Sequence, residues 1–171
     1  LVPDNLGGAG ASAREMAAVL DELGRAVAPV PMLTSAVIAT VAVVDTDSAL
    51  VGELAAGERT AALAVPLSLP PDGDLPVLSV DAGGQVMGSV TSVAGAIEAD
   101  VLIALVESDD GPALAVVEAA DATVTPVVSL DMTRQLADVS FDGAAAVLLD
   151  GDGDAAVRRA LLAGAALLAS E

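Results

Sequence analysis

Apolar residues recur at helical spacing near the start of the chain. Met16 and Leu20 lie about one turn apart, just after Ser12 and Glu15, whose spacing matches a capping box. This pattern predicts a helix with Ser12 as its N-cap. A residue before proline disfavours the α conformation, so the helix must end before Pro29.

Three further helices are expected. Pro31 is placed to open the second, because the missing proline N–H is no loss in a first turn. The third is short, over about residues 48–56, with Asp47 as N-cap and Gly57 as stop. From about residue 154, apolar residues such as Val157 and Leu161 return to helical spacing and predict a final helix.

Between these helical stretches, apolar residues form short runs separated by Gly, Asp and Pro. A loop rich in proline and aspartate at 69–74 interrupts them. Turn residues recur every 8 to 12 positions, which is typical of an antiparallel sandwich or barrel. The predicted strands lie at 60–66, 77–80, 85–93, 101–106, 113–117, 123–128, 136–141 and 145–149.

The order of elements is helices, then strands, then a helix. This is an α+β order and not the alternating order of a Rossmann fold. A glycine cluster at residues 7–10 permits a dinucleotide-binding interpretation, but it follows Pro3 and Asp4 instead of a strand. The alternative, which we favour, is a tight turn that leads into the helix after Ser12.

Composition excludes much chemistry. The 171 residues include no His and no Cys, so a Ser-His-Asp triad, a thiolate nucleophile and the usual zinc sites are excluded. No Lys is present for a Schiff base or a Walker-type phosphate clamp. Phe141 is the only aromatic residue, while hydrophobic residues make up 54% of the chain. The core must therefore consist of Ala, Val and Leu.

Charge and hydropathy limit the partners. The net charge is −19, which argues against nucleic acid and anionic membranes as partners, because phosphate contacts need cations. The longest apolar run, at 36–44, is interrupted by Thr40 and is far shorter than the roughly 20 residues of a membrane span. The absence of Cys fits a cytoplasmic location.

Several segments, in order, resemble the acyl-CoA dehydrogenase family. The turn V-P-D-N-L-G-G-A-G at 2–10 is similar to the family's P-E-x-x-G-G-x-G, and V-L-D-E-L-G-R at 19–25 to its V-x-E-E-L-G-R. The segment A-P-V-P at 28–31 resembles a version common in actinobacterial members. Later, L-D-M-T-R at 130–134 and V-S-F-D-G at 139–143 match L-D-x-T-R and V-x-F-D.

The resemblance implies a three-part α+β architecture. An N-terminal helical domain would cover 1–58, a middle antiparallel β-barrel domain 59–150, and the first helix of a C-terminal helical bundle 151–171. The chain starts without Met and ends within a helical pattern. We therefore expect a segment truncated at both ends relative to the family.

The resemblance also implies a reaction, the α,β-dehydrogenation of an acyl-CoA thioester. A carboxylate takes the α-proton and FAD accepts the β-hydride. FAD lies between the barrel and the bundle, partly across a subunit interface, so a homo- or hetero-oligomer (dimer or tetramer) is implied. The catalytic carboxylate belongs to the bundle, and no catalytic residue is expected within this chain.

Two family motifs place the cofactor contacts. F-A-L-T-E-P falls on residues 61–66, and G-x-K-x-W-I-T-N-A-x-x-A-D falls without a gap on 88–100. The implied FAD-binding residues are Leu63, Ala64, Val93, Ala94 and Gly95.

This sequence departs from both motifs. Ala64 replaces a hydroxyl residue, Ser92 the tryptophan, and Ala94 the threonine that hydrogen-bonds the flavin. Loss of the tryptophan removes a large stacking face, so flavin binding through side chains should be weaker. Backbone N–H groups at Ala94 and Gly95 remain possible donors. Small side chains here also leave room for a bulky acyl group such as a steroid side chain.

Two other functions remain open. The first is a non-catalytic partner subunit of a heteromeric acyl-CoA dehydrogenase that does not bind its own flavin. The second is an unrelated small β-barrel binding domain with helical flanks.

Charged residues offer further candidates. Arg134 is expected to pair with Asp131 or Asp138, the alternative being a phosphate contact. Arg158 and Arg159 are expected on a solvated helix face, the alternative being CoA phosphate or another subunit. The spacing of Asp150, Asp152 and Asp154 permits a calcium interpretation, but the glycine and distal glutamate of an EF-hand loop are missing. A solvated loop at a helix N-terminus is the simpler interpretation.

Overall fold

Helix α1 (Ala13–Ala26) begins at the predicted capping box in the computed structural model, which describes residues 1–170. The Ser12 hydroxyl accepts a hydrogen bond from the Arg14 N–H, and the Glu15 carboxylate accepts one from the Ser12 N–H at 2.9 Å. The Ser12 hydroxyl also donates to this carboxylate and lowers the pKa of Glu15. The helix ends at Val27 (φ 50°), before Pro29, as predicted.

The helix predicted after Pro31 has two parts. Residues Met32–Ala39 form a π-helix (η2), which continues into the α-helix α2 (Thr40–Val43). The buried Thr40 hydroxyl donates to the Ser35 carbonyl five residues earlier, at 2.9 Å. The Ser35 hydroxyl accepts a hydrogen bond from the Ala61 N–H at 3.0 Å, which ties η2 to the first strand.

Helix α3 (Leu50–Ala56) is confirmed, but its predicted N-cap is wrong. Ala49 is the N-cap, and the Ser48 hydroxyl, not the Asp47 carboxylate, accepts from the Leu50 N–H at 3.3 Å. Gly57 ends the helix with φ 71°, as predicted.

The glycine cluster at residues 7–10 forms a tight turn after the short 3₁₀-helix η1 (Asp4–Leu6). A Cβ on Gly8 would lie 2.0 Å from the Val2 carbonyl oxygen, so this close approach requires glycine. The cluster follows a 3₁₀ turn and leads into α1, which excludes the strand–turn–helix context of a dinucleotide motif.

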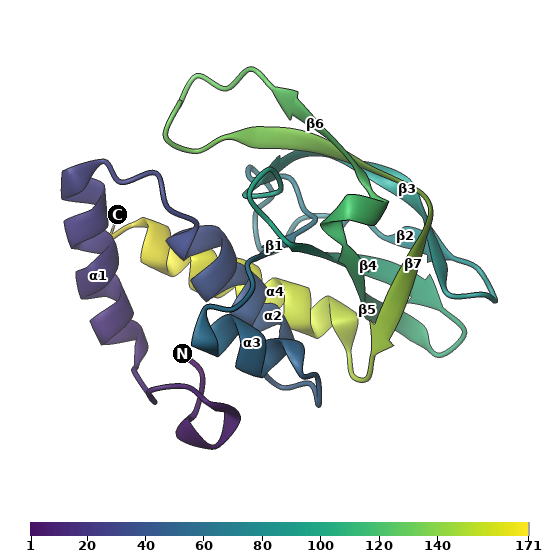
Figure 1. The fold of residues 1–171 in the computed structure, drawn as a ribbon, viewed down its shortest axis with the longest axis horizontal. Helices are drawn as coiled ribbons and strands as arrows, with labels where there is room; N and C mark the ends of the chain where they lie inside the picture. The colour runs from purple at the N-terminus through teal and green to yellow at the C-terminus, as the bar shows by residue number, and fades with distance from the viewer. Residues whose placement is uncertain (171) are drawn as a thin grey trace.

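The strands form a closed barrel beside the helices (Figure 1). Neighbouring strands in the ring are β4, β2, β3, β7 and β5, and pairing between β4 and β5 closes it. β1 lies beside β4, and β6 lies beside β7. The bounds are β1 (Ala61–Leu63), β2 (Leu78–Val80), β3 (Gln85–Ala94), β4 (Val101–Ser108), β5 (Gly111–Glu118), β6 (Thr123–Val127) and β7 (Leu136–Leu149), with a 3₁₀ turn η3 (Ala119–Asp121) before β6.

Two features of the predicted sheet need correction. The barrel is not wholly antiparallel, because β1 and β2 both run parallel to β4. The two runs predicted at 136–141 and 145–149 form one strand, β7. Gly143, with φ 76°, is an extra residue between two β3 pairings, so the glycine makes a bulge instead of ending the strand.

β4 is buried on both faces because it separates two cores. Val101, Ile103 and Leu105 pack against the helices, whereas Leu102 and Ala104 point into the barrel with Phe141. The helical side of the first core includes residues of α2, α3 and α4 (Gly153–Leu168). A smaller cluster joins α1 to η2 and α4 through Leu20, Leu33, Val37 and Leu167.

The start of α4 touches the barrel closely at Gly153. A Cβ there would lie 2.7 Å from the Ala113 carbonyl carbon, which is backbone and cannot move aside alone. We therefore expect Gly153→Ala to lower the free energy of unfolding by about 1–3 kcal/mol. Gly52→Ala is the control. A Cβ at that position in α3 meets nothing within 4 Å, so this change should stabilise by about 0.5–1 kcal/mol. Urea unfolding measures both, and equal effects would contradict the packing described here.

Candidate functional site

The ends of β1 and β3 meet beside η2. Pro66 and Val93 form an isolated antiparallel bridge, and the Leu67 N–H donates to the Ser92 carbonyl at 3.0 Å. After β3 the chain turns at Gly95, where a Cβ would lie 2.6 Å from the Thr34 hydroxyl oxygen. Gly95 also has φ 78°, so both the conformation and the close approach favour glycine.

A small apolar cavity that opens to solvent lies at this junction. None of its lining residues carries a charge. Among the lining residues within 1–170, Thr34 is the only one with a side-chain hydroxyl. The lining residues are Thr34, Ile38, Leu63, Val65, Pro66, Leu67, Ala94 and Leu161.

The structure brings the five predicted cofactor residues together but exposes them differently. Leu63 and Ala94 line the apolar cavity, and Gly95 lines the neighbouring cleft. Ala64 (1% exposed) and Val93 (0%) belong to the barrel core, so their side chains are covered by protein. Leu63 (4% exposed) and Ala94 (8%) are also buried, and a ligand could meet only the parts of their side chains that line the cavity.

Thr34 is a site residue that sequence reasoning missed. It lies on η2, far from both flavin motifs in sequence, and lines both the apolar cavity and the neighbouring cleft. Its hydroxyl donates to the Pro31 carbonyl at 3.5 Å, a long hydrogen bond. The sequence pattern Pro-x-x-Thr gives no signal for this role.

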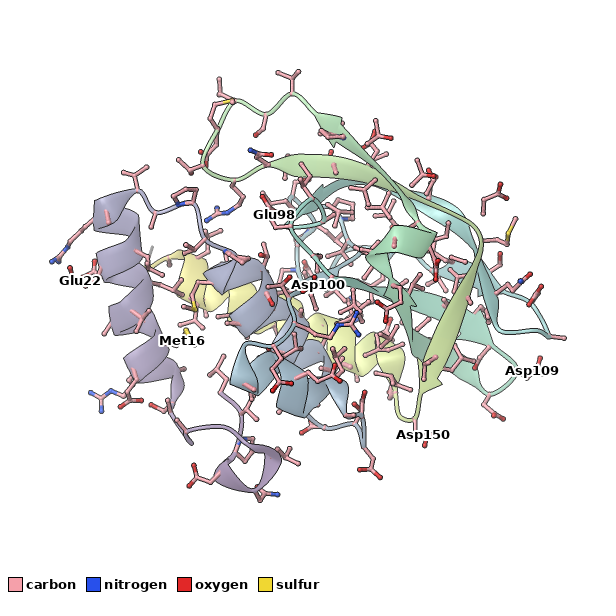
Figure 2. The ribbon with its side chains drawn as sticks, viewed as in Figure 1. Met16, Glu22, Glu98, Asp100, Asp109 and Asp150 are labelled. Carbon is pink, nitrogen blue, oxygen red and sulfur yellow. The ribbon has the colours of Figure 1, made fainter. Side chains whose placement is uncertain are left out.

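The neighbouring cleft separates the segment after α1 from the β6–β7 loop. It is open to solvent and is lined by Pro29, Gly95, Glu98 and Arg134, among others. Figure 2 shows Glu98 where the barrel meets the helical side, whereas Asp109 lies at the tip of the β4–β5 turn. The Thr133 hydroxyl and N–H hydrogen-bond Asp131 and lower its pKa, and Arg134 nearby adds to this shift.

The arginines and aspartates around α4 have structural partners. Arg158, predicted on a solvated helix face, is partly buried. Its guanidinium donates hydrogen bonds to the Asp154 carboxylate at 2.7 Å and to the carbonyls of Pro71 and Gly73. Arg159 forms an ion pair with Asp45 at 3.1 Å.

The Asp152 side chain caps α4 by accepting from the Ala155 N–H at 3.1 Å. Within residues 1–170, no group of three or more His, Cys, Asp or Glu side chains is arranged to hold a metal ion.

Asp100 aligns the first strand with β4. Its carboxylate accepts hydrogen bonds from the Thr60 N–H at 2.8 Å and the Thr60 hydroxyl at 3.0 Å. These hydrogen bonds hold the pKa of Asp100 below its ordinary value, and the one from the Thr60 N–H has the larger effect. The contact sets where β1 starts and hence where Leu63 reaches the cavity.

Fold and sequence comparisons agree. No family model matches the chain. The chain is 35% identical over 156 residues to the acyl-CoA dehydrogenase FadE34 of Mycobacterium tuberculosis, covering 90% of this chain and 20% of that protein. It is 28% identical to a chain of the ChsE4-ChsE5 complex of Mycobacterium tuberculosis, with a TM-score of 0.73, covering 92% of this chain and 45% of that one. PigA, solved with FAD and proline, has a TM-score of 0.79 at 15% identity and shares the fold, covering 99% of this chain and 51% of that one.

The resemblance to the acyl-CoA dehydrogenase family that the sequence predicts is thus confirmed. The chain spans one fifth of FadE34 and about half of each solved chain. No helix within residues 1–170 is both long and apolar enough to cross a membrane.

Gly95→Ala tests the close approach at the site. The added methyl group would crowd Thr34, and the alanine would also have to adopt a positive φ. Gly57 has a similar φ of 71° with nothing within 4 Å, so Gly57→Ala carries the conformational cost alone. We expect Gly95→Ala to lower the free energy of unfolding by about 1–3 kcal/mol more than Gly57→Ala, by urea unfolding. Equal losses would show that Thr34 does not crowd Gly95.

The Asp100 contact predicts a pH dependence. A carboxyl whose folded pKa is lowered stabilises above its unfolded pKa, and this contribution disappears as pH falls through the folded pKa. Asp100→Ala should therefore lower Tm at pH 7, and the difference from wild type should narrow below about pH 4. Asp109→Ala, at an exposed turn, is the control. A Tm difference that stays constant with pH would refute the contribution of the Asp100 carboxylate.

Proposed function

We propose that this chain is a subunit, or part of one, of an acyl-CoA dehydrogenase that removes the α and β hydrogens of an acyl-CoA thioester, with FAD as hydride acceptor. The similarity to FadE34, an acyl-CoA dehydrogenase, supports the reaction class. In this proposal the chain forms the barrel wall of the active site. The flavin contacts and the proton-abstracting carboxylate come mainly from other parts of the assembly.

The chemistry of the apolar cavity is the observation that carries this proposal. It lies where the resemblance places the flavin, yet its lining supplies one hydroxyl, no charge and no aromatic ring. Phe141, the only aromatic residue, lies within the barrel core and is 2% exposed. The lining of this cavity does not fit a flavin held by the cavity alone, because it offers the flavin ring one side-chain hydroxyl and no aromatic stacking partner.

The cavity does fit the wall of an active site. Leu63, Val65 and Leu161 exclude water from one side, which strengthens electrostatic interactions with groups placed opposite. A wall without carboxylates also leaves proton abstraction to a residue on the opposite side.

The relatives support a paired assembly. Since the match covers 20% of FadE34 but 45% of the solved ChsE4-ChsE5 chain, FadE34 is more than twice as long as that chain. FadE34 therefore has room for two units of this fold, and the solved relative is a complex of two named components. We infer that this chain also works beside a second, complementary unit.

A self-sufficient flavoenzyme is the second candidate. The Thr34 hydroxyl favours it, because it lines the same cavity as Ala94, where the family's flavin-bonding threonine is missing. A hydroxyl from η2 would then replace the one lost from β3.

Flavin content of the full-length protein separates the two candidates. Purified alone, it should hold well below one flavin per chain, and co-expression with its complementary unit should restore flavin absorbance. Thr34→Val should leave that content unchanged in our proposal, because Thr34 is not a principal flavin contact. One flavin per chain in the isolated protein, lost in Thr34→Val, would establish the second candidate instead. Thr125→Val, the same substitution at an exposed position of β6, is the matched control.

A further inference from the structure

Strand β3 contains a bulge with an unusual backbone conformation. Val90 pairs with Val139 and Val93 with Ala137, so two residues of β3 oppose the single residue Asp138. The second of these, Ser92, has φ 58°. A residue with a side chain pays a conformational cost there that glycine avoids, so surrounding contacts must hold Ser92 in place.

Asp138 supplies one of those contacts. Its carboxylate accepts a hydrogen bond from the Ser92 N–H at 2.9 Å, and the pair is partly buried. This N–H is turned out of the β3–β7 ladder by the bulge and would otherwise lack a strand partner. Loss of the acceptor would leave a partly buried donor unsatisfied, which opposes the left-handed conformation.

The Ser92 carbonyl contacts a residue that lines the apolar cavity. The Ser92 carbonyl accepts the Leu67 N–H at 3.0 Å, while Pro66 bridges to Val93. Pro66, Leu67 and Ala94 all line the apolar cavity. The bulge thus joins two separate strand ends at the cavity wall, and Asp138 holds the bulge from the opposite strand.

We propose that Asp138 is a positioning residue for the active site: it holds Ser92 in the left-handed bulge and thereby fixes the strand ends that shape the cavity. Asp138 acts through Ser92 and does not touch the ligand. The ligand part of this inference rests on the proposed flavin-dependent function. The inference explains how the backbone of this wall is aligned although Ser92 and Ala94 stand where the family has larger flavin-contacting side chains.

The test uses the full-length protein in its complete assembly, with FAD as the probe. Asp138→Ala removes the acceptor, whereas Asp138→Asn keeps an oxygen that can accept from Ser92. Asp142→Ala, an exposed position on the same strand, is the matched control. Val124→Ala, on β6 beside the barrel core, is a stability control that leaves the bulge intact. Amide hydrogen exchange of peptides containing Leu67 and Gly95 is read together with the rate of flavin loss.

We expect Asp138→Ala to speed exchange at Leu67 by about tenfold and to speed flavin loss by a similar factor. Asp138→Asn and Asp142→Ala should stay near wild type. Val124→Ala should lower Tm without faster exchange at Leu67. The Ser92→Gly substitution should partly rescue Asp138→Ala, because glycine adopts the bulge conformation without a side chain.

Three results would overturn the proposal. They are unchanged exchange at Leu67 in Asp138→Ala, faster exchange without faster flavin loss, or flavin loss in Val124→Ala as fast as in Asp138→Ala. A wild-type assembly that contains no flavin would defeat the proposed function. Exchange at Leu67 would still decide whether Asp138 holds the bulge.

Discussion

The barrel and the helical layer both depend on β4, whose alternate side chains belong to different cores. Val101, Ile103 and Leu105 face the helices, while Leu102 and Ala104 face the barrel interior. With a single aromatic residue in the chain, these cores are filled by small aliphatic side chains, so backbones approach closely. Gly153 against Ala113 is one such contact. The position of the cavity therefore follows from backbone packing more than from large side chains.

The site lies where both layers meet. β1, aligned beside β4 by the Asp100–Thr60 contact, brings Leu63 from the barrel, and η2 brings Thr34 from the helical side. β3 reaches the same place through its bulge at Ser92. A cavity assembled from three elements tolerates changes in its side chains as long as the backbone stays in place. This explains how the fold persists although Ala64 and Ala94 stand where the resemblance implies hydroxyl-bearing residues.

Local signals in the sequence predicted local structure well. Ser12 with Glu15 and the stop at Gly57 depend on neighbouring residues, and both are confirmed. The motif alignment also brought Leu63 and Ala94 to one cavity. The parallel pairing of β1 with β4 was missed, because hydrophobic spacing does not identify a strand's partner. The Asp138 contact with Ser92 spans 46 residues, and a serine gives no sign of a positive φ, so the sequence alone offered no signal for it.

The most direct test is an experimental structure of the complete assembly with FAD bound, in which each hydrogen bond to the flavin is assigned to its residue. The account predicts that Leu63 and Ala94 line one wall and that most flavin hydrogen bonds come from outside residues 1–171. A flavin held mainly by Thr34 and the backbone N–H groups of Ala94 and Gly95 would contradict it, because this chain would then be a flavin-binding subunit in its own right.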